Sequence, residues 1–225
     1  MSKILILKND RAGDLFTSLK LISTLLRDFR SSSIYMSELN YSFSFFFKKC
    51  KVKKLNYNLN FFDKMRILFD MILNSYDRVY ILSPKNFFFT LPFLFRKTKF
   101  YAIVYDGKKR DRPSKFLRKF LFKYKIVSRK KINKFSYRQL QEQLIDDKVT
   151  LDNDCNNLNI PKINSYITKM VPKNYIFFQF RYKFFNDLNW SKKNIIFLLN
   201  LLKKKYENVL FCSDIEDNSK NIQFK

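Results

Sequence analysis

The residues with the clearest capacity for chemistry lie in one short turn near the amino terminus, in the stretch KILILKNDRAGDLFTSLKLI. The apolar run from Ile4 to Leu7 leads into a polar turn that contains Gly13, one of only two glycines in the chain, followed by Asp14. A carboxylate at this position suits removal of a proton from an incoming hydroxyl group. The alternative, an acid that only caps the following helix and complements its dipole, stays open.

The composition excludes several other kinds of chemistry. The chain contains no histidine, which rules out Ser-His and Cys-His catalysis and leaves Asp, Glu, Lys or Tyr as any general base. Its three cysteines, Cys50, Cys155 and Cys212, are far apart and form no CxxC pair, so we expect reduced thiols and no zinc site. A dinucleotide site is disfavoured too, because one glycine cannot bring several backbone amides to a pyrophosphate.

The elements that must position this turn are alternating strand-like and helix-like runs. Strands are expected at 3–8, 33–36, 52–57, 78–83 and 99–105, and helices at 14–29, 41–49, 61–76 and 86–96. This alternation indicates an α/β domain with a mainly parallel sheet, whose ligands bind beyond the carboxyl ends of the strands. Ser83 stands at such an end, where a simple turn and a place in the binding cleft are the two alternatives.

The segment 108–138 is strongly basic, with 14 Lys and Arg residues and one acid, Asp111. Four of its apolar residues have the spacing of one helix face: Phe116, Phe120, Leu121 and Tyr124. Three interpretations remain open, namely a helix of the first domain with a solvated Lys-rich face, a helix that contacts anionic membrane, and a nucleic-acid-binding helix. The last has no recognition signature, so we expect no specific nucleic-acid partner. A further helix is expected at 135–145.

The chain is expected to form two domains: residues 1–150, then a polar linker at 151–172, then residues 173–225. The second domain would contain a strand at 175–180, a helix at 191–206 and a strand at 208–212. One strand-helix-strand unit does not cover both faces of a sheet, so we expect it either to extend the first sheet or to be a second domain that is cut short, which a separate chain could complete.

Two stretches resemble the heptosyltransferase family, the family-nine glycosyltransferases. Its amino-terminal motif has a strand, a basic residue, a polar turn, Gly-Asp and then Ser or Thr four residues after the acid. The matching residues here are Lys8, Asp10, Arg11, Gly13, Asp14 and Ser18. The second stretch, YIFFQFRYKFFNDLNWSKKNIIFLLNLLKKKYENVLFCS, resembles the start of the family's carboxy-terminal domain. Trp190 matches the tryptophan of its Lys-x-Trp loop, with Leu188 in place of the lysine.

The resemblance implies a GT-B architecture, with an acceptor-side Rossmann-like domain at 1–150 and a partial donor-side one at 173–225. It also implies inverting transfer of a heptose-like sugar from a nucleotide-diphosphate donor to a lipopolysaccharide-type or other glycan acceptor, without metal or cofactor. Asp14 would be the general base, and Lys8 and Arg11 would hold anionic groups of the acceptor. Gly13, Ser18 and Trp190 would be further substrate-binding positions. Family members are longer and carry a glycine-containing donor loop, so activity of this chain alone is not implied.

The formal net charge of +26 supports a rival class, a non-catalytic basic protein that binds anionic membrane or nucleic acid. A codon bias toward Lys, Asn, Ile, Phe and Tyr would explain the same excess without function. The sequence shows no signal-peptide pattern and no 18-residue apolar stretch without charge. We therefore expect a cytoplasmic protein, peripheral on the inner face of the inner membrane.

Overall fold

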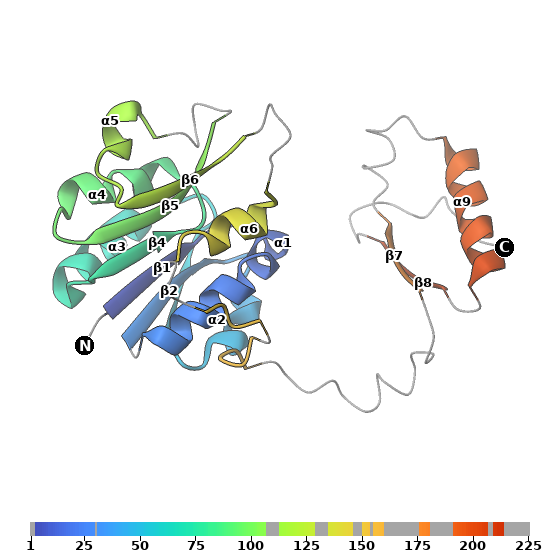
Figure 1. Ribbon diagram of the computed structural model, residues 1–225, viewed down its shortest axis with the longest axis horizontal. Helices are drawn as coiled ribbons and strands as arrows, with labels where there is room; N and C mark the ends of the chain where they lie inside the picture. The colour runs from blue at the N-terminus through green and yellow to red at the C-terminus, as the bar shows by residue number, and fades with distance from the viewer. Residues whose placement is uncertain are drawn as a thin grey trace. The chain divides into compact units, whose positions relative to one another are not determined.

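In a computed structural model, the chain divides into two units, Met1–Pro161 and Lys162–Lys225 (Figure 1). The residues that the structure describes are 3–29, 31–106, 113–128, 135–145, 150–153, 155–159, 176–180, 191–206 and 209–213. The first unit extends to Pro161, so the segment 151–159, which the sequence analysis assigned to the linker, belongs to this unit.

The first unit is built on a six-stranded sheet with the order β3-β2-β1-β4-β5-β6, in which every neighbouring pair is parallel. The strands are β1 (Lys3–Lys8), β2 (Ser31–Ser37), β3 (Lys51–Leu55), β4 (Arg78–Ile81), β5 (Lys99–Tyr105) and β6 (Lys123–Val127). This doubly wound order confirms the expected α/β, Rossmann-like domain. Its direction reverses between β1 and β4, where ligands of such sheets bind.

Strand β1 shows why the sequence forms this sheet. Its apolar run is buried on both sides, because Ile4 and Ile6 pack into one core cluster while Leu5 and Leu7 pack into the other. Strands covered on both faces are typically continuous apolar runs of this kind. Lys8 closes the strand on the same side as Ile4 and Ile6, since side chains alternate along a strand.

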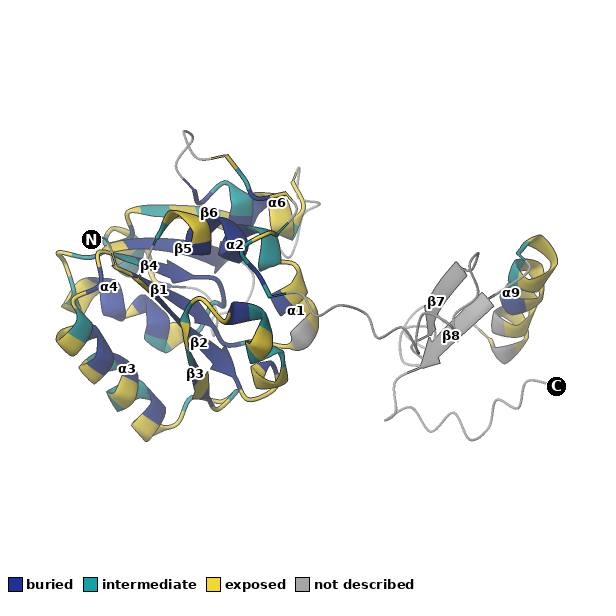
Figure 2. Cartoon of the chain, turned by 90° about the horizontal axis from the view of Figure 1, so that it is seen from below, coloured by how far each residue is buried: buried dark blue, intermediate teal, exposed yellow. Residues whose placement is uncertain are grey.

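Helices cover both faces of the sheet (Figure 2). The first cluster packs beneath α1 (Ala12–Phe16), α2 (Leu19–Asp28), the 3₁₀ helix η1 (Tyr41–Phe47) and α6 (Tyr137–Glu142). The second packs beneath α3 (Phe61–Asn74), η2 (Asn86–Phe89), α4 (Leu91–Leu94) and α5 (Lys115–Arg118). The site at the end of β1 therefore lies beside α1, on the face that α2 and α6 also cover.

The helix expected at 14–29 is interrupted, and the interruption lies next to Asp14. The Thr17 and Ser18 hydroxyls donate to the backbone carbonyl of Asp14, at 2.8 and 3.1 Å. Such local side-chain bonds compete with the helical pattern and separate α1 from α2. The helix expected at 86–96 is also divided, into η2 and α4, with Pro92 in the first turn of α4.

The expected aromatic helix face in the basic segment was wrong for residues 116–124. Helix α5 ends at Arg118, and Tyr124 lies in strand β6, which pairs with β5 and forms an edge of the sheet. The alternating exposure along Lys123–Val127 is that of an edge strand, and its lysines discourage pairing with another chain. Two parts of segment 108–138, at 108–112 and 129–134, lie outside the described residues.

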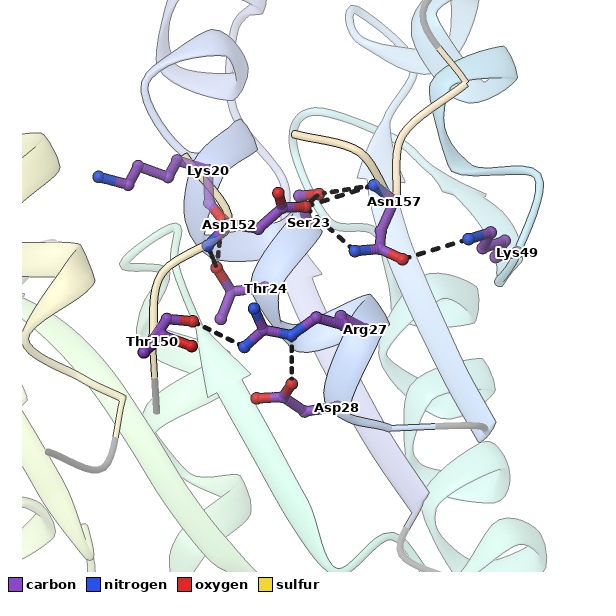
Figure 3. A network of polar contacts seen from close by, with 9 residues as sticks. All are labelled: Lys20, Ser23, Thr24, Arg27, Asp28, Lys49, Thr150, Asp152 and Asn157. Atoms are coloured by element: carbon purple, nitrogen blue, oxygen red, sulfur yellow. Dashed lines mark hydrogen bonds and ion pairs between the residues drawn. The ribbon is translucent and has the colours of Figure 1, made fainter. Parts of the chain in front are cut away.

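A hydrogen-bonded clasp holds the segment 150–159 on α2 (Figure 3). The Ser23 hydroxyl donates to the Asp152 carboxylate, and the Asp152 amide donates to the Thr24 hydroxyl at 2.9 Å. Burial acts to raise the pKa of Asp152, but hydrogen bonds from Ser23 and Asn157 outweigh it, and the net pKa is lowered. Arg27 adds a bond of 2.6 Å to the Thr150 carbonyl. This segment is therefore an ordered cover of the first core cluster.

In the second unit, β7 (Ile176–Phe180) and β8 (Val209–Ser213) are parallel neighbours in a two-stranded sheet, and α9 (Lys192–Lys205) lies between them in the sequence. The strand-helix-strand order agrees with the expected one. Ser191 caps α9 by accepting a hydrogen bond from the Asn194 amide. Among the residues described in both units, no helix is both long and apolar enough to cross a bilayer.

Candidate functional site

The candidate site lies where the carboxyl ends of three neighbouring strands meet. Lys8 is the last residue of β1, Ser37 the last of β2, and Ser83 follows the end of β4 by two residues. Because β1 is paired with both β2 and β4, these ends surround the point at which the strand order reverses. The polar turn after β1 therefore occupies the ordinary ligand-binding edge of a doubly wound sheet.

Asp10 ties this turn to all three strands. Its carboxylate accepts hydrogen bonds from the Lys8 ammonium at 2.6 Å, the Ser83 hydroxyl at 2.7 Å and the Asn40 amide at 3.1 Å. The Ser37 hydroxyl donates to the Asp10 backbone carbonyl. With three donors on its carboxylate, Asp10 fixes the backbone of the turn and has little capacity left for a substrate proton.

Lys8 is fully buried, and its ammonium group faces Asp10. The ammonium also lies 6.0 Å from the centre of the Tyr137 ring, within the range of a cation–π contact. Burial lowers the pKa of Lys8, while the charges of Asp10 and Asp14 act in the opposite direction. The resemblance gave Lys8 a direct role with anionic acceptor groups, but the folded chain presents no exposed ammonium at this position. Lys8 instead positions Asp10.

Asp14 stands above this buried pair and is exposed to solvent. Asp14 does not cap α1, because Arg11 occupies the cap position and no side chain caps the helix. Asp14 does lie in the first turn of α1, where an acid complements the helix dipole, so this part of the alternative is confirmed. Partial burial and the nearby Asp10 charge raise the pKa of Asp14. Lys8, Arg11 and the Arg11 backbone amide lower it, but by less. An accessible carboxylate with a raised pKa at a ligand-binding edge is a candidate general base.

The backbone at Gly13 does not require a glycine by conformation or by packing. The chain has no glycine with positive φ among its described residues, and a Cβ added at Gly13 would meet no atom within 4 Å. Gly13 lies in α1 directly before Asp14, and the space beside its Cα is open, so another molecule can approach there.

The other residues assigned from the resemblance have different positions. Arg11 is exposed beside Asp14, so its guanidinium is available to an anionic group. Ser18 is buried, and its hydroxyl donates to the Asp14 carbonyl, so it supports the turn from below. Trp190 lies outside the described residues. The turn thus brings together Arg11, Gly13 and Asp14 at the surface over a buried polar layer.

Several residues of this polar layer had no signal in the sequence. Asn9 is fully buried and donates to the carbonyls of Asn56 and Tyr57, at 3.1 and 3.3 Å, which secures the loop after β3. The Tyr137 hydroxyl donates to the Leu82 carbonyl at 2.9 Å, and burial raises the pKa of this tyrosine. Lys8, Asp10 and Ser18 of the motif, and the position of Ser83 at the end of an expected strand, were the sequence signals for this layer.

The arrangement suits proton transfer and the binding of an anionic group. Asp14 can accept a proton from a hydroxyl, and Arg11 can pair with a negative charge near the same hydroxyl. No group of three or more His, Cys, Asp or Glu residues that could hold a metal ion occurs within the described parts of the chain. A pocket of about 700 Å³ lies elsewhere, between the carboxy-terminal ends of α3 and α4.

Comparison with protein-family models, with curated proteins and with solved structures yields no match to this chain, so its assignment depends on the fold and on the residues of the turn.

Proposed function

We propose that this chain is a glycosyltransferase of the inverting type, with Asp14 as its general base. The observation that carries the proposal is an exposed carboxylate with a raised pKa at the carboxyl edge of the sheet, next to the reversal of strand order. A hydroxyl attacks poorly as a neutral group, and a carboxylate that removes its proton during attack lowers the barrier.

In this reaction, the hydroxyl oxygen of a glycan acceptor bonds to the anomeric carbon of the donor sugar. Its proton passes to Asp14, and the bond from the anomeric carbon to the nucleotide diphosphate breaks, with inversion of configuration. Arg11 holds an anionic group of a lipid-linked or core-oligosaccharide acceptor. The buried Lys8–Asp10 pair and Ser83 fix the turn that carries Asp14. The second unit, with Trp190 just before α9, would serve the nucleotide-sugar donor.

The GT-B architecture and the location on the inner face of a membrane belong to this proposal. The first unit supplies one Rossmann-like domain, and the β7–α9–β8 unit has the order expected for part of a second. A separate chain that completes the second unit would supply a larger donor site, because two strands and one helix bury little apolar surface.

The test is a transfer assay with nucleotide-diphosphate sugars and a core-oligosaccharide acceptor, performed on the parent chain and on Asp14→Asn. We expect the substitution to slow transfer by about 10²- to 10⁴-fold, the usual contribution of a general base. Asp28→Asn is the matched control, because Asp28 forms an ion pair with Arg27 at the far end of α2. Equal rates for parent and Asp14→Asn would refute the base assignment, and a parent without transfer would refute activity of this chain alone.

The rival proposal, a non-catalytic basic protein that binds anionic membrane or nucleic acid, is supported by the charge of +26. It loses one of its supports, since the aromatic helix face expected at 116–124 is replaced by a short helix and a strand. A catalytic effect of Asp14→Asn would separate the two, because a binding protein has no rate to lose.

A further inference from the structure

The outer side of α3 is apolar apart from Arg66, although it is the side that faces solvent (Figure 2). Phe62 is 79% exposed and Leu73 is 80% exposed, and three more apolar residues of the helix are exposed, namely Phe61, Phe69 and Ile72. The acids of this helix, Asp63 and Asp70, are instead buried on its inner side. An isolated surface helix of a soluble protein normally shows the opposite arrangement, with charged residues outward.

The apolar surface continues from α3 across α4 to α5. The pocket of about 700 Å³ is lined by Ile72 of α3 and by Phe93 and Leu94 of α4, and all three side chains are exposed. Phe93 in turn contacts Phe116 of α5, with ring centres 6.1 Å apart. One continuous face therefore joins three helices, and we call it the α3–α5 face.

The charges around the α3–α5 face are mainly positive. Its two helical acids point into the fold, where Asp63 accepts hydrogen bonds in the capping box with Asn60 and Asp70 pairs with Lys53. One exposed acid, Asp77, lines the pocket itself and accepts a hydrogen bond of 2.7 Å from the Lys3 amide. The basic residues on or next to the three helices are Lys64, Arg66, Arg96, Lys97, Lys115, Arg118 and Lys119.

We propose that the α3–α5 face docks on an anionic lipid surface. Exposed phenylalanine and leucine side chains enter the boundary between headgroups and acyl chains, and the surrounding lysines and arginines pair with lipid phosphates. Charge complementarity selects this occupant, because a second copy of the chain would bring the same positive rim against itself. The face overlaps the basic segment 108–138, for which membrane contact was expected, at α5, whereas its parts on α3 and α4 lie outside that segment. The inference does not depend on the proposed sugar transfer.

The pocket in this face and Asp14 lie at opposite edges of the sheet. The pocket is lined by residues that precede β4 and β5, at the amino-terminal edge, whereas Asp14 follows β1 at the carboxyl edge. Helix α3 follows β3 and so begins at the carboxyl edge, which places Phe61 and Phe62 toward the edge that carries the polar turn.

The test is co-sedimentation of the full chain with vesicles of phosphatidylcholine alone or with about 30% phosphatidylglycerol, which gives the vesicle surface a negative potential. The informative variant is the double substitution Phe62→Ser and Leu73→Ser, because both side chains are exposed and contribute little to the core. The matched control is Phe197→Ser on α9, where the phenylalanine is 66% exposed. We expect the parent and the control to bind anionic vesicles, and the double variant to bind at least about 10-fold more weakly.

The outcomes separate the possible occupants of the face. Binding of the double variant equal to that of the parent would overturn the proposal, because the general positive charge would then explain all the affinity. If the double variant loses RNA binding but keeps vesicle binding, the face is a nucleic-acid surface, and the proposal of lipid docking is overturned. If the parent and the control self-associate without lipid and the double variant does not, the face is an interface between two copies of the chain instead. Thermal unfolding followed by circular dichroism checks that the variants remain folded.

Discussion

Among the described residues of the first unit, Lys8 pairs with Asp10 and Lys53 pairs with Asp70, and the two pairs differ in what surrounds them. Lys8 and Asp10 close the carboxyl end of β1, with side-chain exposures of 0% and 15%. Lys53 and Asp70 join β3 to α3, with both side chains 9% exposed. Asp70 also accepts hydrogen bonds from Asn74 at 2.7 Å and from Tyr76 at 3.1 Å. The second pair is sealed by its neighbours, whereas the first borders solvent.

The comparison shows how the role of a lysine–aspartate pair depends on its surroundings. Around Lys53 and Asp70, every partner lies within the fold, so the pair fixes how α3 packs on the edge of the sheet. Around Lys8 and Asp10, a third ionisable group is nearby and exposed. The Asp10 charge raises the pKa of Asp14 and the Lys8 charge lowers it. The first pair therefore adjusts a neighbouring acid as well as holding a turn.

The largest expected effect comes from breaking the sealed pair. Asp70→Ala leaves the buried Lys53 ammonium without its counter-charge, and we expect a loss of about 3–5 kcal/mol in the free energy of unfolding. Urea unfolding followed by circular dichroism measures it. The control is Asp77→Ala, which removes an exposed carboxylate and should cost about 1 kcal/mol or less. A loss for Asp70→Ala no larger than that of the control would show that the pair does not hold α3.

The corresponding change in the solvent-bordering pair should cost less stability. In Lys8→Met, Asp10 keeps its donors from Asn40 and Ser83 and some contact with water, so we expect a loss of about 1–3 kcal/mol. The pKa of Asp14 should rise further, since the charge that lowers it has been removed. Carboxyl titration followed by NMR measures this shift. Lys53→Met is the control, and an equal shift there would contradict a specific link between Lys8 and Asp14.

The strands of the first unit were largely predictable, most clearly where a short apolar run lies between polar turns, as in β1, β4 and β5. Strand β6 was missed for a physical reason. The apolar residues Phe116, Phe120, Leu121 and Tyr124 have helical spacing up to the start of this strand, whereas pairing with β5 supplies backbone hydrogen bonds that a local pattern does not reveal. The break after Thr17 was also missed, because the helical apolar spacing continues across it while two hydroxyls disrupt the backbone pattern.

The candidate site, too, was predictable from the sequence only in part. The position of Asp14 could be predicted, because a Gly-Asp turn directly after a first strand must lie at the carboxyl edge. The partners of Asp10 could not, since Asn40 and Ser83 are 30 and 73 residues away in the sequence. Tyr137 was hidden for the same reason, as its place beside Lys8 depends on how α6 packs on the sheet.

A smaller loss of unfolding free energy is expected when the hydroxyl partner of either pair is removed. Ser83→Ala removes one donor from Asp10, and Tyr76→Phe removes one donor from Asp70. We expect each to cost about 0.5–1.5 kcal/mol of unfolding free energy, the net value of one hydrogen bond. Only Ser83→Ala should slow sugar transfer, because only Asp10 positions the turn of Asp14. Similar slowing by Tyr76→Phe in the transfer assay would assign the effect to general loss of stability.

The smallest expected effect is a gain in stability on removing the charge of Asp14. The folded state raises the pKa of this acid above its ordinary value of 3.8, so the folded state binds the proton more tightly than the unfolded state. Between these two pKa values the unfolded state loses its proton first, and stability therefore falls as the pH rises. Above the folded pKa, the full cost of the ionised carboxylate is present. Asp14→Asn avoids that cost.

We therefore expect Asp14→Asn to unfold at a slightly higher temperature than the parent at pH 7, and the difference to vanish below the ordinary pKa of aspartate, where both side chains are neutral. Thermal unfolding at several pH values measures it. The gain should be small, because solvent around the exposed side chain screens the Asp10 charge. A gain at pH 7 combined with slower transfer identifies a carboxylate that is retained for chemistry despite its cost to stability. A loss of stability at every pH would instead give Asp14 the structural role that Asp70 has.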